Sequence, residues 1–287
     1  MKAIFKHELR LYFESMTAYV FGAFLLLFIG IGSMLYNLRS AVSNFEFVLS
    51  FASIIFVVIV PVLTMRCLSE ERKQKTDQLL YSLPISTTQV VLGKYGALLV
   101  VFFIPMCFVA LYPLLFSRFG EVYLPTAYGS LAAFFLLGAA LLSVGVFLSS
   151  LTDSQGLAAG LGIGTILLNY YCVSLSEYVT STAVGSLVTF LVLLAALGLL
   201  FRALTRNNAL AIGVFLVGCA GLAGVYLLDS AALEGLLPGM MKQISLFERF
   251  YTFVNGVFDL TGVVYYLSVI VFFLFLTVQS LEKRRYN

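Results

Sequence analysis

Charged residues are scarce in this chain: Asp, Glu, Lys and Arg make up 11% of its 287 residues. The centres of its long apolar runs carry none of them. A carrier driven by protons or sodium usually needs ionisable groups at membrane depth, so this absence argues for energy supplied from outside the bilayer. The chain also lacks the G-x-x-x-x-G-K-[ST] loop that cradles phosphates, so we expect no ATP hydrolysis by the chain itself.

Histidine and cysteine offer little for catalysis or metal binding. The single histidine, His7, excludes a multi-histidine metal site. The four cysteines lie in or beside apolar runs without a C-x-x-C pair, which is typical of small buried hydrophobic residues. Basic residues are not interleaved with aromatic residues on a soluble face, so nucleic acid is not an expected partner. We expect no catalytic residue, metal site or cofactor in this chain.

Long apolar runs dominate the sequence. Hydrophobic residues make up 61% of it and the mean hydropathy is +1.02, which is typical of an integral membrane protein. Runs of spanning length predict an all-α polytopic membrane fold with about eight transmembrane helices. They lie near residues 17–36, 47–67, 91–116, 126–149, 156–176, 183–201, 208–228 and 261–281.

The basic residues are distributed unevenly between the two predicted membrane faces. Of the 17 lysines and arginines, four (Arg39, Arg118, Lys242 and Arg249) fall on one side and the remaining 13 on the other. Because the side richer in Lys and Arg is normally cytoplasmic, both termini are predicted to be cytoplasmic. The chain is therefore expected to be a multi-pass protein of the plasma or inner membrane, in a prokaryote.

A densely charged stretch separates the second and third predicted spans. We call residues 69–86 the charged segment. Glu70 and Glu71 suit the first turn of a helix, and three basic residues follow them. Leu79, Leu80 and Leu83 then provide an apolar edge, and Pro84 ends the helix. Ser86 with Gln89 predicts a capping box that starts the next helix. A plain positive-inside loop is the alternative interpretation.

This segment carries a family resemblance. Glu71-Arg72, Lys75-Thr76-Asp77-Gln78-Leu79-Leu80, Pro84-Ile85-Ser86 and Val91-Leu92-Gly93-Lys94 resemble the signature of ABC-2 type transporter permeases. In that family the segment is a coupling helix that docks into a cleft of the ATP-binding subunit. The resemblance assigns this contact to Glu71, Arg72, Lys75, Thr76, Asp77, Leu79, Leu80 and Pro84. Many family members have a glycine before the threonine, where this chain has Lys75.

The resemblance implies one ABC-2 type transmembrane domain over residues 1–287. Its expected role is a permease subunit, an exporter of unidentified cargo, driven by ATP and Mg²⁺ on a separate cytoplasmic ATP-binding cassette subunit. A second copy of the permease, or a homologous one, would complete a dimer. Many members have six spans, and 183–201 and 208–228 would then be an addition. A membrane scaffold that recruits an ATPase is the main alternative, and a secondary carrier is a further one.

Two other stretches are predicted to lie at the membrane faces. Residues 1–16 form an amphipathic helix for the cytoplasmic interface, although Glu8 interrupts its apolar face; an ordinary charged tail is the alternative. Residues 229–260 form an outer amphipathic segment with a helix near 244–256. The latter segment resembles permeases of gliding motility and nitrous-oxide maturation. Within it, Glu248 and Asp259 are candidates for interface anchors or cargo contacts.

Inside the spans, a few residues invite specific interpretations. Gly156, Gly160 and Gly164 recur every four residues, which favours close helix packing; a flexible gate is the alternative. Asn169 is a polar position near the outer end of its span, suited to an interhelical hydrogen bond, an aromatic belt or cargo. Pro105 and Pro113 should bend the third span, because each removes a backbone donor.

Overall fold

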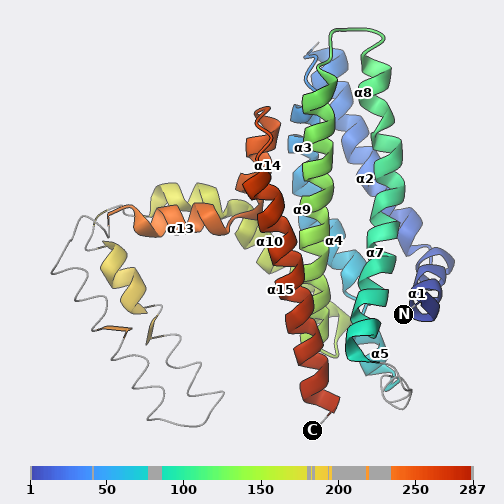
Figure 1. The fold of residues 1–287 in the computed structure, drawn as a ribbon, viewed down its shortest axis with the longest axis vertical. Helices are drawn as coiled ribbons and strands as arrows, with labels where there is room; N and C mark the ends of the chain where they lie inside the picture. Colours follow the sequence, from blue (N-terminus) through green and yellow to red (C-terminus); the bar gives the residue numbers. More distant parts are fainter. Residues whose placement is uncertain are drawn as a thin grey trace. The chain divides into compact units, whose positions relative to one another are not determined.

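The structure is a computed structural model, and it describes residues 2–40, 42–76, 86–179, 182, 185–192, 194–195, 218–219 and 234–285. All regular elements in these residues are helical, as Figure 1 shows. They are α1 (Lys2–Glu14), α2 (Thr17–Ser33), a π-helix (Met34–Arg39), α3 (Glu46–Ala52), a 3₁₀ turn (Ser53–Ile55), α4 (Phe56–Thr64), α5 (Ser69–Lys73), α7 (Thr87–Val109), α8 (Leu111–Phe116), α9 (Leu124–Leu151), α10 (Gln155–Tyr178), α13 (Leu236–Ile244), α14 (Leu246–Val254) and α15 (Leu260–Arg285).

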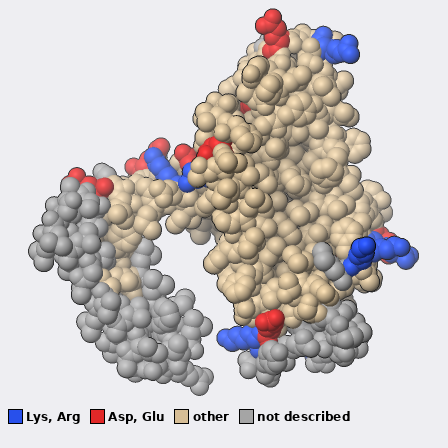
Figure 2. Space-filling view, in the orientation of Figure 1, with Lys and Arg blue, Asp and Glu red and all other residues tan. Residues whose placement is uncertain are grey.

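Within the described residues, six helical stretches are long and apolar enough to cross a membrane, and they confirm six of the predicted spans. The stretches are Thr17–Arg39, Glu46–Lys73, Thr87–Phe116, Leu124–Leu151, Gln155–Tyr178 and Leu260–Arg284. The two further predicted spans, 183–201 and 208–228, lie largely outside the described residues and stay predictions. The face in Figure 2 is mostly uncharged, with acidic and basic side chains in a few small groups.

The chain divides into two compact units, one of residues 1–170 and 246–287 and the other of residues 171–245. In the first unit α9 is the central helix and contacts α3, α4, α7, α14 and α15. Phenylalanines fill the space around it. The centroid of the Phe134 ring lies 4.5 Å from the centroid of the Phe56 ring and 5.7 Å from that of the Phe250 ring. In the second unit, the Cys172 thiol donates to the Met241 carbonyl over 3.3 Å, joining the end of α10 to α13.

Small residues on α9 let its neighbours approach closely. Gly145 faces Thr64 of α4, where an added Cβ would lie 2.8 Å from the Thr64 Cβ. Gly138 faces the Phe102 ring of α7 in the same way. Since real Cβ atoms do not come this close to other atoms, a side chain at Gly145 would displace Thr64, and one at Gly138 would displace the Phe102 ring.

Local signals explain several helix boundaries. The Ser86 hydroxyl accepts the Gln89 N–H over 3.3 Å, which confirms the predicted start of α7. Between α7 and α8 lies Ala110, three residues before Pro113, which cannot donate to the carbonyl of Val109. Met16 separates α1 from α2 with a left-handed φ of 57°. This turn lets α1 pack against α7 while α2 enters the bundle.

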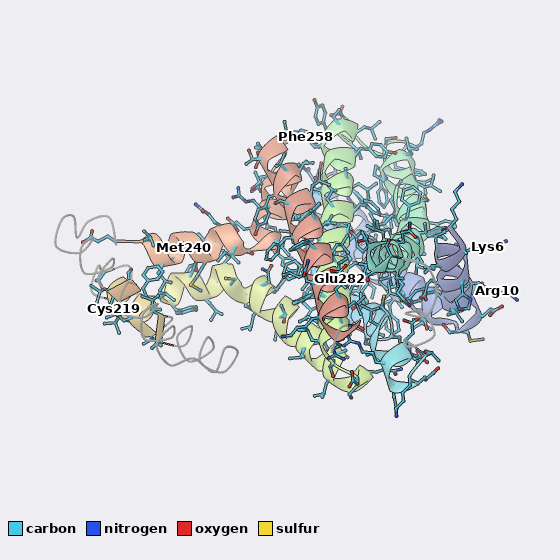
Figure 3. The ribbon with its side chains drawn as sticks, turned by 60° about the horizontal axis from the view of Figure 1, so that its bottom comes forward. Lys6, Arg10, Cys219, Met240, Phe258 and Glu282 are labelled. Atoms are coloured by element: carbon cyan, nitrogen blue, oxygen red, sulfur yellow. The ribbon has the colours of Figure 1, made fainter. Side chains whose placement is uncertain are left out.

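Helix α1 confirms the predicted N-terminal helix, and its faces differ. Glu8 and Tyr12 are buried, whereas Lys6 and Arg10 are exposed. Figure 3 shows Lys6 and Arg10 pointing away from the bundle. Glu8, which interrupts the apolar face in the sequence, therefore lies on the packed side of the helix.

Candidate functional site

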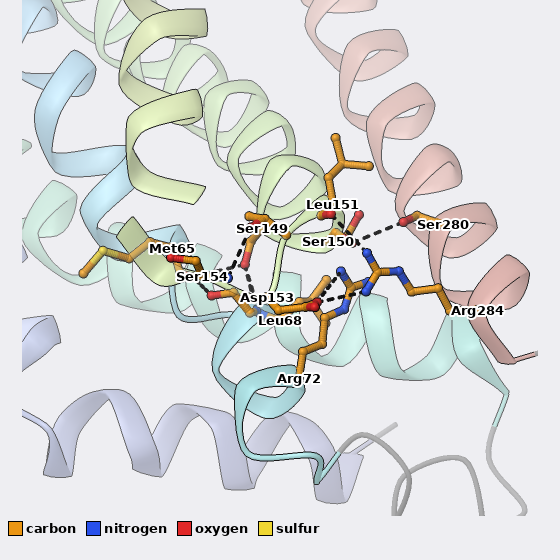
Figure 4. A network of polar contacts seen from close by, with 12 residues as sticks. Met65, Leu68, Arg72, Ser149, Ser150, Leu151, Asp153, Ser154, Ser280 and Arg284 are labelled. Carbon is orange, nitrogen blue, oxygen red and sulfur yellow. Dashed lines mark hydrogen bonds and ion pairs between the residues drawn. The ribbon is translucent and has the colours of Figure 1, made fainter. Parts of the chain in front are cut away.

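The charged segment begins where α4 ends, and a serine of α9 fixes the junction. The Ser149 hydroxyl accepts the N–H groups of Leu68 and Ser69 over 3.1 and 3.2 Å, and it donates to the Met65 carbonyl over 3.2 Å (Figure 4). These are backbone groups that helix ends leave without intrahelical partners. One side chain therefore ties the start of the segment to the central helix.

A buried lysine ties the segment to α1 and α7. Lys94 Nζ donates to Glu8 Oε1 over 2.6 Å and to Glu71 Oε1 over 2.8 Å. The Lys94 and Glu8 side chains are 2% and 8% exposed. A charge so far from water is tolerated only when it is paired and hydrogen-bonded, and two carboxylates satisfy this condition. We call Glu8, Lys94 and Glu71 the lysine junction.

Tyr12 lies one turn beyond Glu8 on α1, and its side chain is buried near Cys67. Burial raises the pKa of Tyr12 well above its ordinary value, and the nearby Cys67 thiol and Glu8 carboxylate raise it further. Tyr12 therefore stays a neutral phenol at every physiological pH.

A cavity of about 700 Å³ opens beside the lysine junction, between α1 and the α4–α5 end of the second span.

A second polar cluster ties the segment to the α9–α10 turn and to α15 (Figure 4). Arg284 Nη1 lies 3.0 Å from Asp153 Oδ1, and Arg284 Nη2 donates to the Leu151 carbonyl over 3.1 Å. Arg72 Nη1 lies 3.9 Å from the same Asp153 oxygen. We call Arg72, Asp153 and Arg284 the arginine junction. Its Asp153 and Arg284 side chains are solvated, at 68% and 42% exposed, whereas its Arg72 side chain is buried, at 3% exposed.

The charged segment leaves α5 through a turn that normally uses glycine. Lys75 has a left-handed φ of 56°. The Thr76 N–H bonds the Glu71 carbonyl over 2.9 Å, and the Lys75 N–H bonds the Arg72 carbonyl over 3.0 Å. These two bonds form a Schellman motif with Lys75 at the position where glycine is preferred. The glycine expected before Thr76 from the family resemblance thus corresponds to a real conformational requirement. Asp77, Leu79, Leu80 and Pro84 lie outside the described residues.

Comparison with protein families agrees with this arrangement. A family model described as "ABC-2 family transporter protein" matches residues 14–183. The chain belongs to the ABC-2 family of transporter membrane proteins. No curated protein matches the chain. The matched range contains the charged segment and both Lys94 and Asp153, whereas Glu8 and Arg284 lie outside it. The chain is thus an ABC-2 permease domain, a transport subunit without catalytic chemistry of its own.

At the opposite end of the ABC-2 domain, two predicted site residues cap helices. The Asn169 side-chain oxygen accepts the Leu246 N–H over 2.9 Å, at the start of α14. Asp259 accepts the N–H groups of Thr261 and Gly262 over 2.9 and 3.2 Å at the start of α15. Hydrogen bonds from Thr261 keep the pKa of Asp259 below its ordinary value. Glu248 is half-buried on α14, and Asn169 and Asp259 cap different helices.

The glycine repeat of this ABC-2 chain presents an open face. No described atom lies within 4 Å of a Cβ added at Gly160 or Gly164, and Gly156 meets only the Ser154 hydroxyl at 4.0 Å. Close helix packing at this face therefore stays a prediction. The close contact on α10 is instead made by Gly162, where an added Cβ would lie 2.9 Å from the Pro61 Cβ.

Sequence reasoning missed five residues of the contacts that hold the segment in place: Glu8, Lys94, Ser149, Asp153 and Arg284. Two of them carry a signal in hindsight. Glu8 interrupts the apolar face of α1, and Lys94 lies between the buried Val91 and Leu98 on α7. An acid and a base, each on an apolar face, are natural partners for one another. Ser149 offers no such signal, because a serine near a helix end is common.

Proposed function

We propose that this ABC-2 permease uses the charged segment to receive movement from a separate ATP-binding cassette subunit. The supporting observation is that the segment is tied on both sides. The lysine junction links it to α1 and α7, and the arginine junction links it to the α9–α10 turn and α15. A displacement of residues 69–76 would therefore reach four parts of the bundle directly.

The direction of the chain in the membrane supports the same proposal. The charged segment lies on the predicted side with 13 of the 17 lysines and arginines, which the positive-inside rule makes cytoplasmic. An ATP-binding subunit would meet it there and would supply ATP and Mg²⁺. A second permease copy or a homologous permease would complete the dimer. Export is the proposed direction, and the gliding-motility and nitrous-oxide-maturation permeases are the proposed branch.

The proposed anchors for the partner are Leu79 and Leu80. Burying a leucine contributes roughly 1.5–3 kcal/mol, so Leu79→Ser with Leu80→Ser should weaken the complex by about two to three decades in affinity. Arg72 is held in the arginine junction with its side chain 3% exposed, so the charge test falls on the exposed Lys75. Lys75→Glu should weaken the complex less than the double-serine change, because charge pairs at an exposed contact contribute only about 0–1 kcal/mol. The measurement is the amount of a P-loop-containing subunit that co-purifies with each variant, at equal expression.

Transport coupling and mere recruitment predict different results for one further measurement. Spin labels on the exposed Val271 of α15 and Phe24 of α2 should change their separation when ATP is added to the complex, and not when it is added to the permease alone. A complex that keeps its ATPase but shows no ATP-dependent change would be a scaffold. Normal co-purification by the double-serine variant would contradict docking through this segment.

A further inference from the structure

The cavity beside the lysine junction lies at a membrane boundary. Its walls come from α1, from Thr17 at the start of the first span, from residues between Arg66 and Thr76 around the end of the second span, and from Lys94 of α7. Its volume of about 700 Å³ falls within the range of small-molecule sites. It is thus a space of ligand size where headgroups meet the protein.

The lining carries charges of both signs. Glu8, Glu70 and Glu71 contribute carboxylates, and Arg66 and Lys94 contribute cations. A carboxylate can accept about four hydrogen bonds. Glu8 accepts one from Lys94 at 2.6 Å, and Glu70 accepts one from Gln74 at 3.4 Å. Acceptor capacity thus remains for a donor in the cavity, and a guanidinium is available for an anion.

One edge of the cavity adjoins a face that is suited to acyl chains. Ser15 and Thr17 line the cavity, and the residue between them, Met16, is 71% exposed. Along α2 the apolar side chains of Tyr19, Val20 and Phe24 are also exposed. An amphiphile with its headgroup in the cavity could therefore lay its hydrocarbon chain along α2.

We propose that this cavity binds the headgroup of an aminophospholipid as a resident lipid. The primary ammonium donates to Glu70 and Glu8, the phosphate lies against Arg66, and the acyl chains follow α2. A purely anionic headgroup would meet three carboxylates against two permanent cations, and a quaternary amine has no N–H to donate. The lining therefore selects a zwitterion with a primary amine.

The test uses the purified full chain in detergent, without any ATPase subunit, so its outcome is independent of the proposed coupling role. The probes are phosphatidylethanolamine and phosphatidylcholine, each with a fluorophore on the acyl chain. Both share the phosphate, but only the first carries N–H donors. We expect the first to bind about tenfold more tightly, which corresponds to one charge-assisted hydrogen bond.

Substitutions in the cavity lining test the recognition of the amine and of the phosphate separately. Glu70→Gln should remove most of the preference for phosphatidylethanolamine, whereas Arg66→Ala should weaken both probes alike. Glu14→Gln and Lys73→Ala are the matched controls, because both residues are exposed and lie outside the cavity lining. Neither control should change binding.

Several results would overturn the proposal. Equal binding of the two probes, tighter binding of phosphatidylglycerol, or an unchanged preference in Glu70→Gln would each exclude amine recognition. Competition by water-soluble phosphoethanolamine at the concentration of the lipid would exclude a contribution from the acyl chains along α2.

Discussion

The two junctions that hold the charged segment are built from the same kinds of side chain, yet their surroundings differ. Lys94 is 2% exposed and has two carboxylates within 2.8 Å. Asp153 is 68% exposed, and its two arginines lie 3.0 and 3.9 Å away. Because the first junction is buried, water could not solvate a charge that lost its partner there, and each charge must stay paired. In the second junction the Arg72 side chain is also buried, at 3% exposed, but Asp153 and Arg284 reach water. The Asp153–Arg284 contact is therefore screened by solvent and can open at little cost in free energy.

This difference assigns separate tasks to the two sides of the segment. The lysine junction fixes α1 and α7 to the segment as one piece. The arginine junction is a contact that can form and break while the fold remains intact. In a permease driven from the charged segment, the solvated side is the natural place for movement relative to the bundle.

The largest expected effect tests the buried side. Lys94→Met would leave the Glu8 and Glu71 carboxylates together without their cation, and it should lower the free energy of unfolding by about 3–5 kcal/mol. Lys73→Met, at an exposed position of α5, is the control and should change little. Unfolding of the purified variants by a denaturing detergent measures both.

A double variant tests whether the stability loss in Lys94→Met comes from its uncompensated carboxylates. Adding Glu8→Leu to Lys94→Met should recover part of the lost stability, because it removes one of the two uncompensated carboxylates. If Lys94→Met is as stable as Lys73→Met, the lysine junction holds nothing together and the contrast with the arginine junction disappears.

An intermediate effect is expected between the junctions, at the left-handed turn. A non-glycine residue in this conformation costs about 1–2 kcal/mol, so Lys75→Gly should stabilise the end of α5 by about 1 kcal/mol. The matched control is Lys73→Gly, which places glycine within α5 and should destabilise it by a similar amount. Hydrogen exchange of the Thr76 amide reports on both variants, and faster exchange in Lys75→Gly would contradict the Schellman assignment.

The smallest effect is expected at the solvated side. Asp153→Asn removes the shared carboxylate of the arginine junction. Its short contact, to Arg284, is exposed, and its contact to the buried Arg72 is 3.9 Å long, so the free energy of unfolding should change by less than about 1 kcal/mol. Raising the salt concentration should reduce the difference between wild type and variant further. A loss as large as that of Lys94→Met would show that the two junctions are equivalent, and our comparison would fail.

The sequence predicts the local features well. Among the described residues, the six spans, the Ser86 cap of α7, the N-terminal helix and helix α14 follow from hydropathy and short-range patterns. The contacts that define the junctions join distant positions: Lys94 lies 86 residues from Glu8, and Ser149 lies 81 residues from Leu68. Which distant residues meet depends on how the helices pack, and no local pattern contains that information.

The glycines illustrate the same limit. A regular four-residue repeat directs attention to Gly156, Gly160 and Gly164, whereas the tightest contacts in the described residues occur at other glycines: Gly138, Gly145, Gly162, Gly218 and Gly262. Periodicity identifies a face that could accept a close neighbour. Only the fold decides which such face receives one.

Helix α15 is anchored at both ends, by the Asp259 cap at its start and by two contacts near its end. There the Ser280 hydroxyl donates to the Ser150 carbonyl over 3.3 Å, and Arg284 pairs with Asp153. Helix α9 packs along it and, at 28 residues, is about 42 Å long. Mechanically the pair is a strut: two helices joined side by side resist bending far better than either alone. Under the proposed coupling, a push delivered at Asp153 while the arginine junction is closed would travel the length of this strut, and the far membrane face would tilt or shift in step with the near one.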